Sequence, residues 1–430
     1  MIPTLLAAAV AAVLCALAAR RLERWNIAVP AVMVAAGAVV GLTVEGSVGA
    51  VLNTTAAQRV AEIILAVLLF VDATEVRGGR LWGRAPGTAA RMLLVAMPLS
   101  ILATVVVGGL LFPALPWPVL LVLACVVVPI DFASSERVVR DRRLPARLRS
   151  ALNVEGGYND GIVSPVFLVA LALAGGAATQ GSGPWHALST AVPHAVTAIV
   201  VGLLLGTVLG GALELATVRG ATTDRSRRTV VLIAPVATYT AALGLGGNGF
   251  VAAFVCGIAF RYVHRVLLAR RLRGTDGGVR AAGGAAVAMG RDFVLLEDVT
   301  AILTAAMWFV VGIAGVYLAS AVDLPILVFC VLALTVLRIV PVALALVGSG
   351  LGARERLLAG LLGPRGTTTI VFGLLAFNGL PDGDPADTIL IATVLCVAGS
   401  VLLHGLGSSA AIARLAPERT RETAAPRAGG

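Results

Sequence analysis

The sequence has no lysine and few charged residues of any kind. Charged side chains make up 13% of its 430 residues, whereas a soluble globular domain carries about 25%. Hydrophobic residues make up 58%, and long apolar runs recur along the whole chain. About 20 such residues span a bilayer as a helix. This composition excludes a soluble protein and predicts an all-α, polytopic membrane protein.

Paired cysteines and enzyme motifs are also lacking. All the cysteines lie in apolar segments without a CxxC spacing: Cys15, Cys125, Cys256, Cys330 and Cys396. A metal centre or a disulfide framework is therefore not expected. No nucleotide-binding motif or catalytic constellation appears, so we predict a protein that is not an enzyme and needs no cofactor.

The net charge of +10 comes entirely from arginine, because all 33 basic residues are arginines. A positive excess often indicates nucleic-acid binding. Here, however, all but three arginines fall in every second loop or in the last residues of the chain, as expected for cytoplasmic segments. We therefore expect the lipid bilayer as a partner, and no nucleic acid. The preference for arginine, with abundant alanine, glycine and valine, suggests a GC-rich bacterial genome. We therefore expect the protein in the bacterial plasma membrane.

The apolar runs predict about thirteen transmembrane helices. They lie near residues 2–19, 27–44, 60–75, 92–112, 117–135, 150–174, 185–217, 228–246, 249–268, 291–319, 324–347, 354–378 and 386–412. The start of the chain lacks the charged region of a signal peptide, so the first helix is expected to be retained. With the arginine-rich loops inside, the N-terminus is predicted outside and the C-terminus in the cytoplasm.

The segment ALNVEGGYNDGIVSP places three polar side chains in an apolar membrane helix: Glu155, Asn159 and Asp160. An ionised carboxylate at a bilayer centre costs about 2.5–3.5 kcal/mol. Such residues face a cavity, pair with a buried base or bind an ion. Arg338 and Arg365 also lie within apolar helices, and they are the candidate partners of the acids.

Two of the predicted helices are interrupted next to a charge. In one, Pro129 removes a backbone donor and frees carbonyl groups just before Asp131. In the other, glycine and proline surround Arg365 in the run GPRG. These helices are about seven apart in chain order, so they cross the bilayer in opposite directions. Paired interrupted helices of this kind indicate an inverted-repeat transporter with a site at the membrane midplane.

The predicted domain organisation follows from this pairing. Residues 1–412 form one transmembrane domain. It contains inverted six-helix repeats at about 1–174 and 228–412, joined by a linking helix at 185–217. Residues 413–430 are rich in arginine and proline, and they are predicted to form a short cytoplasmic tail.

The order of several motifs supports a family resemblance. They are LFVDATEV at 69–76, VVPIDFAS at 127–134, VEGGYNDG at 154–161, NGFVAAFVCGIAF at 248–260 and GPRG at 363–366. Together, across most of residues 1–412, they resemble the motifs of monovalent cation/proton antiporters of the bacterial NhaP and animal NHE type. This resemblance implies an NhaA-like antiporter fold with crossing discontinuous helices, a homodimer, and exchange of Na⁺ or Li⁺ for H⁺.

The resemblance also implies roles for the matching residues. Asp160 would bind either a proton or the cation, with Asp131 beside it in the interrupted helix. Asn159 stands where electrogenic relatives have a second acid, which suggests electroneutral one-for-one exchange. Asp72 would contribute more weakly near the ion site.

These residue types suit the chemistry of monovalent cations. Na⁺ and Li⁺ are hard cations that prefer oxygen ligands. The carboxylates, the Asn159 amide and the backbone carbonyls of Val128 to Ile130 would supply such a shell. Since burial raises the affinity of a carboxyl group for a proton, the cation and the proton would compete for Asp160, and alternating access would couple their opposite movements.

A salt bridge between helices is a further implication. Glu155 would pair with Arg338 or, alternatively, with Arg365. Either partner would keep this acid ionised and outside the transport cycle.

Three residues depart from the family pattern and leave the transported ion open. Ile130, Phe132 and Gly156 stand where the family usually has threonine, proline and serine. K⁺/H⁺ exchange is therefore a second candidate function. A Na⁺-coupled symporter of organic anions and a non-transporting relative are two more. The single acidic cluster argues against the symporter, which would need a larger substrate cavity and more than one cation site.

Overall fold

Every regular element of the described chain is a helix, which confirms the predicted all-α class. The computed structural model describes residues 2–25, 27–43, 55–75, 82–83, 85–132, 141, 143–177, 184–273 and 279–415. Within these ranges, seven helices are long and apolar enough to cross a membrane. Three shorter apolar helices accompany them. The predicted tail lies outside the described residues from position 416 onwards.

The helices follow the predicted segments closely. In chain order they are α1 (Ile2–Arg24), α2 (Val29–Thr43), α4 (Thr55–Glu75), α5 (Pro86–Arg91), η1 (Met92–Ala96), α6 (Met97–Leu111), α7 (Trp117–Val127), α9 (Ala146–Ala172), η3 (Leu173–Ala177), α10 (Pro184–Val218), α11 (Asp224–Gly244), α12 (Gly249–Arg273), α13 (Val279–Leu318), η4 (Ala319–Ala321), α14 (Leu324–Leu334), α15 (Val336–Ala345), α16 (Ala353–Leu361), α17 (Thr367–Gly379) and α18 (Asp384–Leu415). Each predicted range overlaps one of these helices or several in succession. The number that cross the membrane, and the inverted repeats, stay predictions.

Several boundaries differ from the predicted ones. The fourth predicted helix begins earlier, at Pro86, and contains one turn of π-helix. The fifth ends at Val127, two residues before Pro129, because proline lacks the donor and clashes with the preceding turn. The tenth begins at Val279. The eleventh is divided at Thr335, whose ψ of −92° is not helical; no residue type there signals the break.

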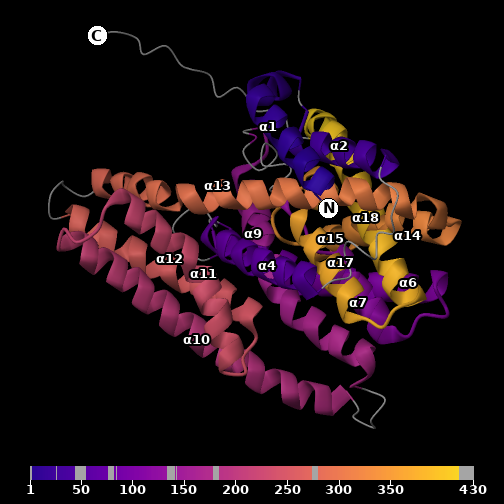
Figure 1. The fold of residues 1–430 in the computed structure, drawn as a ribbon, viewed down its shortest axis with the longest axis horizontal. Coiled ribbons are helices and arrows are strands. Elements are labelled where there is room, and N and C mark those ends of the chain that lie inside the picture. The colour runs from indigo at the N-terminus through magenta and orange to yellow at the C-terminus, as the bar shows by residue number, and fades with distance from the viewer. Residues whose placement is uncertain are drawn as a thin grey trace.

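The helices form two groups joined by α13. In Figure 1, α10, α11 and α12 lie side by side on one side of the molecule, and α14, α15, α17 and α18 lie on the other. The long helix α13 runs along both groups and packs against α2, α11, α12 and α18. Between the groups, α9 packs against α4, α7, α12 and α17. The polar segment of α9 is therefore enclosed by helices from both halves of the chain.

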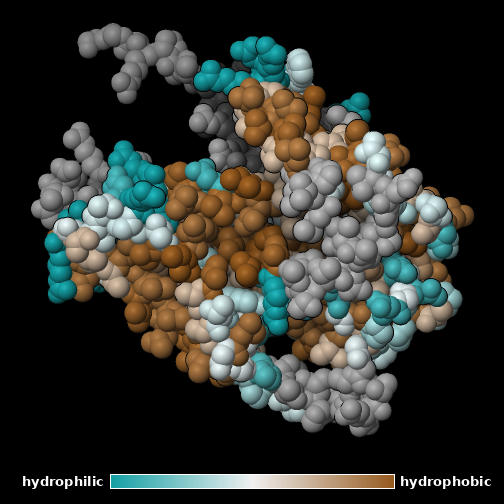
Figure 2. Space-filling view, in the orientation of Figure 1, coloured by the Kyte–Doolittle hydropathy of each residue, from teal (hydrophilic) through white to brown (hydrophobic). Residues whose placement is uncertain are grey.

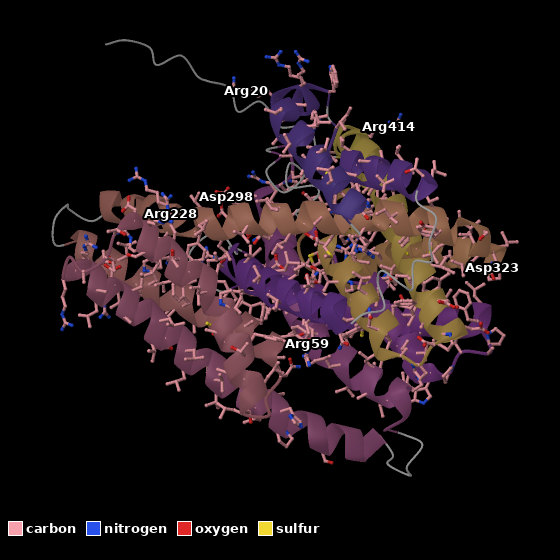
Figure 3. The ribbon with its side chains drawn as sticks, viewed as in Figure 1. Arg20, Arg59, Arg228, Asp298, Asp323 and Arg414 are labelled. Carbon is pink, nitrogen blue, oxygen red and sulfur yellow. The ribbon has the colours of Figure 1, made fainter. Side chains whose placement is uncertain are left out.

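The surface has the polarity of a multi-pass membrane protein. Figure 2 shows hydrophobic side chains across the middle of the molecule, over α10 to α13, and hydrophilic ones nearer the helix ends. In Figure 3, Arg20 and Arg414 lie at the top of the view, Arg228 toward its left, Asp323 at its right and Arg59 in its lower half. The orientation of these charges in the membrane stays a prediction.

The contact between α2 and α13 depends on two glycines that face each other. A Cβ atom on Gly312 would lie 2.1 Å from the Val34 carbonyl oxygen, and one on Gly37 would lie 2.0 Å from that of Phe309. Real Cβ atoms do not approach backbone this closely, so the two helices touch only because these side chains are absent.

Replacing Gly312 by alanine is expected to force α2 and α13 apart and to lower the free energy of unfolding by about 1–3 kcal/mol. The measurement is the apparent melting temperature of the purified protein in detergent. Gly211→Ala is the matched control, because a Cβ atom at Gly211 in α10 meets nothing within 4 Å. Equal melting temperatures for the two variants would contradict the close contact.

Candidate functional site

The polar residues of the predicted motif lie in the middle of α9 and are buried. Glu155, Asn159 and Asp160 expose 3%, 2% and 2% of their surface. Residues four apart share one face of a helix, so Glu155 and Asn159 project to the same side. A face that carries an acid and an amide in the interior needs polar partners. Asn159 finds one in the backbone after α7, and Glu155 finds one on α15.

The two helix breaks lie directly against each other. After α7 ends, the Asp131 backbone N–H donates to the Pro364 carbonyl oxygen at 2.9 Å. In return, the Thr367 N–H at the start of α17 donates to Asp131 Oδ2 at 2.7 Å. A Cβ atom on Gly366 would lie 2.2 Å from the same oxygen, so only glycine fits there. The Asp131 carboxylate therefore caps the positive end of the α17 helix dipole.

Asp160 lies beside this crossing and keeps one oxygen unengaged. Its neighbours include the Thr368 hydroxyl, the Asp131 carboxylate and the Arg365 guanidinium. Among the described residues, Asp160 Oδ1 has no hydrogen-bond partner although it is buried. The Thr367 hydroxyl oxygen is buried without a partner as well. A buried carboxylate oxygen without a donor is costly unless a cation or a proton satisfies it.

Asn159 links α9 to the end of the interrupted α7. Its Nδ2 donates to the Ile130 carbonyl oxygen at 2.7 Å, and its Oδ1 accepts from the Asp160 N–H at 2.6 Å. The Ile130 carbonyl, which the sequence predicted as a cation ligand, thus accepts a hydrogen bond from protein. Val128, the other predicted carbonyl ligand, is buried just after the last turn of α7.

Glu155 pairs with Arg338 and not with Arg365. The Arg338 guanidinium donates to both carboxylate oxygens of Glu155, at 2.9 and 3.0 Å. Both side chains are buried, and this fork-to-fork geometry is the strongest form of such a pair. A Cβ atom on Gly363 would lie 1.9 Å from Arg338 Nε, so the glycine of the second break makes room for the guanidinium.

Arg365 holds the second break together. Its guanidinium donates to the carbonyls of Gly363 at 2.8 Å and Ala333 at 3.3 Å. Its backbone N–H donates to the Ser400 hydroxyl at 2.7 Å. His404 Nε2 lies 3.1 Å from the Leu361 carbonyl, which is left free where α16 ends. These contacts satisfy backbone groups that the interruption exposes.

One predicted site residue, Asp72, and two residues that were not predicted, Ser400 and His404, remain to be placed. Asp72 lies half-buried in the last turn of α4, and its contribution to ion binding stays a prediction. Ser400 and His404 were not predicted as part of the site. Their only sequence signal is polarity within an apolar helix, which does not identify a partner.

A second buried polar cluster lies between α10, α12 and α13. The His264 ring lies between Glu214 Oε2, at 3.6 Å, and Asp292 Oδ2, at 3.4 Å. Arg227 donates to Asp292 at 2.9 Å, and Arg271 lies 3.4 Å from Glu214. These residues join α10, α11 and α12 to α13, and none of them belongs to α9 or to the two helix breaks. The cluster is therefore distinct from the residues around Asp160.

Comparison with known proteins gives the same family over nearly the whole chain. Residues 8–413 match the family model described as "Sodium/hydrogen exchanger, transmembrane". The uncharacterized Na⁺/H⁺ exchanger YjcE of Escherichia coli (strain K12) is 26% identical over 187 residues, which are 42% of this chain and 33% of that protein. The uncharacterized exchanger Mb2309 of Mycobacterium bovis is 30% identical over 152 residues, 35% of this chain and 26% of that protein. The chain thus spans a third or less of the length of these relatives.

Solved structures share the fold. The sodium proton antiporter MjNhaP1 from Methanocaldococcus jannaschii at pH 8 superimposes with a TM-score of 0.73, covering 97% of this chain and 99% of that chain at 19% identity. An electron-microscopy structure of the same antiporter gives a TM-score of 0.69, with 96% and 98% coverage at 19% identity. The similarity confirms the predicted antiporter fold.

Proposed function

We propose, because the chain belongs to the family of transmembrane sodium/hydrogen exchangers, that it moves a monovalent cation, Na⁺ or Li⁺, and H⁺ in opposite directions across the membrane. The observation that carries this proposal is the environment of Asp160. Its carboxylate is buried beside two crossing helix breaks, and one of its oxygens has no donor within the described chain. Such a group requires a positive ligand, and the two candidates are a cation and a proton.

Competition for this carboxylate provides the coupling. A hard monovalent cation binds oxygen atoms, and Asp160 Oδ1 with the Thr367 hydroxyl supplies oxygens that no described residue engages. A proton on Asp160 satisfies the same carboxylate and removes the negative charge that holds the cation. The site therefore carries one ion or the other, and exposure to the two sides in turn exchanges them.

The other acids of the site are held in place by protein contacts, which supports electroneutral one-for-one exchange. Asp131 accepts the Thr367 N–H and caps α17. Glu155 is fully engaged by Arg338. Asn159 cannot take up a proton, and its amide bonds the Ile130 carbonyl. Asp160 is thus the acid that remains available for the exchange.

The test uses inside-out membrane vesicles from cells that lack their own antiporters, with a pH-sensitive fluorescent dye inside. Addition of Na⁺ or Li⁺ to acidified vesicles is expected to restore fluorescence as H⁺ leaves, and vesicles without the protein serve as the control. If K⁺ alone produces the response, the protein is a K⁺/H⁺ exchanger. No response to any cation would refute exchange.

Clamping the membrane potential at zero is expected to leave the rate of exchange unchanged, since an electroneutral cycle moves no net charge.

A further inference from the structure

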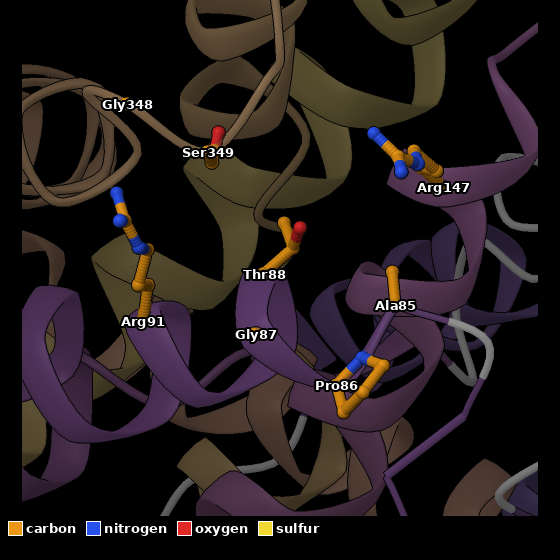
Figure 4. A pocket seen from close by; sticks show the side chains of 8 residues that line it. All are labelled: Ala85, Pro86, Gly87, Thr88, Arg91, Arg147, Gly348 and Ser349. Atoms are coloured by element: carbon orange, nitrogen blue, oxygen red, sulfur yellow. The ribbon is translucent and has the colours of Figure 1, made fainter.

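A basic cavity lies at the starts of α5 and α9, beside the loop after α15. It has a volume of about 310 Å³ and is lined by Ala85, Pro86, Gly87, Thr88, Arg91, Arg147, Gly348 and Ser349. The lining contains two guanidinium groups and two hydroxyl groups and no acid. Figure 4 shows Thr88 and Ser349 between the two arginines, which stand on opposite sides of the cavity.

The loop between α15 and α16 brings the two arginines together. Gly348 and Gly350 have φ angles of 74° and 80°, a left-handed conformation that glycine adopts without strain. A Cβ atom on Gly348 would lie 3.7 Å from one Arg91 nitrogen, and one on Gly350 would lie 3.3 Å from an Arg147 nitrogen. The turn thus presents its backbone to both guanidinium groups, although they come from different helices.

Neither arginine is neutralised by a carboxylate in the described part of the chain. Arg91 donates to the Val347 carbonyl, which leaves its charge uncompensated. By contrast, Arg143, three residues before the start of α9, is engaged by Asp141 through contacts of 2.7 to 3.1 Å. The Ser349 hydroxyl between them donates to the Leu346 carbonyl of its own loop at 2.7 Å. The two guanidinium groups, with Thr88 beside them, therefore carry the case for a bound anion.

The lining and the position of the cavity favour a phosphate group. Guanidinium groups bind phosphate oxygens through paired N–H donors, and the lining holds two of them without an acid. The cavity lies at the start of two helices that are long and apolar enough to cross a membrane, Pro86–Leu111 and Ala146–Gly175, on the predicted cytoplasmic side. Its volume is at the lower end of the range for small-ligand pockets, about 300–1,000 Å³.

We propose that this cavity binds a phosphate group, carried either by an anionic lipid headgroup or by a soluble phosphate compound. The bound group bridges Arg91, Arg147 and the loop after α15. It thereby ties α9, which carries Asp160, to α15, which carries Arg338. A bound phosphate group stabilises the packing of these elements. This proposal does not depend on which ion the protein transports.

The test measures the apparent melting temperature of the purified full chain in detergent. Phosphatidylglycerol is titrated against phosphatidylcholine, and Tris phosphate is titrated against Tris chloride at equal ionic strength. Stabilisation by phosphatidylglycerol alone assigns a lipid phosphate, stabilisation by inorganic phosphate alone assigns a soluble one, and stabilisation by both assigns the shared chemistry. No stabilisation by either probe would overturn the proposal.

Variants locate the effect. Arg147→Gln is expected to raise the concentration of the stabilising probe, phosphatidylglycerol or phosphate, at half-saturation about tenfold or more, because charged hydrogen bonds are lost. Because Arg147 is exposed, the melting temperature of Arg147→Gln in phosphatidylcholine should equal that of the parent protein. Arg91→Gln is the second variant. Arg143→Gln removes the same charge from the same segment without lining the cavity, and it should bind like the parent. If Arg147→Gln and Arg91→Gln both bind the probe as tightly as the parent protein, the cavity is not the site. The same holds if Arg143→Gln weakens binding as much as they do.

Discussion

Replacing Asp160 by asparagine is expected to reduce cation-dependent fluorescence recovery to that of vesicles without the protein. Asparagine has the same shape but can neither carry a negative charge nor release a proton. Both ligands therefore lose their common site, whereas the packing of the 2%-exposed side chain is kept. The variant is compared with the parent protein at equal amounts in the membrane, across a series of Na⁺ and Li⁺ concentrations.

Ser164→Ala is the matched control for this variant. Ser164 is buried one helical turn beyond Asp160, and its hydroxyl donates to the Gly161 carbonyl of its own helix at 3.3 Å. This variant should retain exchange. Undiminished exchange by Asp160→Asn would refute the assignment of Asp160 as the shared site.

In the parent protein, competition predicts that the apparent KM for the cation rises as the pH falls, because protons occupy more of the sites.

Removing the Arg338 side chain is expected to destabilise the protein by about 3–5 kcal/mol, because Glu155 would be left as a buried charge without a partner. Glu155 is 3% exposed and has both oxygens bonded to Arg338. The expected result is a large fall in the apparent melting temperature of Arg338→Leu in detergent. Glu155→Leu should show a comparable fall, since it leaves the guanidinium unpaired.

The double variant Glu155→Leu with Arg338→Leu separates a structural role from a transport role. Replacing both partners by apolar side chains removes the two charges together, so part of the lost stability should return. Because neither residue takes part in the proposed exchange, the folded double variant should still exchange cations for protons. A double variant as unstable as the sum of the two single variants would show that the pair contributes no coupling energy.

The sequence by itself determined the class of the fold and the location of the unusual segments. Long apolar runs set the helix positions, since a bilayer admits few other structures for them. Pro129 and the GPRG run indicated the two breaks, because proline and glycine act on the backbone locally. The burial of Glu155 and Asp160 could likewise be predicted from the apolar residues around them.

Tertiary structure alone decided which of these features meet. Asp131 caps α17, which lies 236 positions further along the chain, and Glu155 pairs with Arg338 and not with Arg365. The division at Thr335, the engagement of the Ile130 carbonyl by Asn159 and the cavity between Arg91 and Arg147 were equally invisible in the sequence. The physical reason is that the cost of burying a charge is a local property of the chain, whereas its partner depends on where distant helices cross.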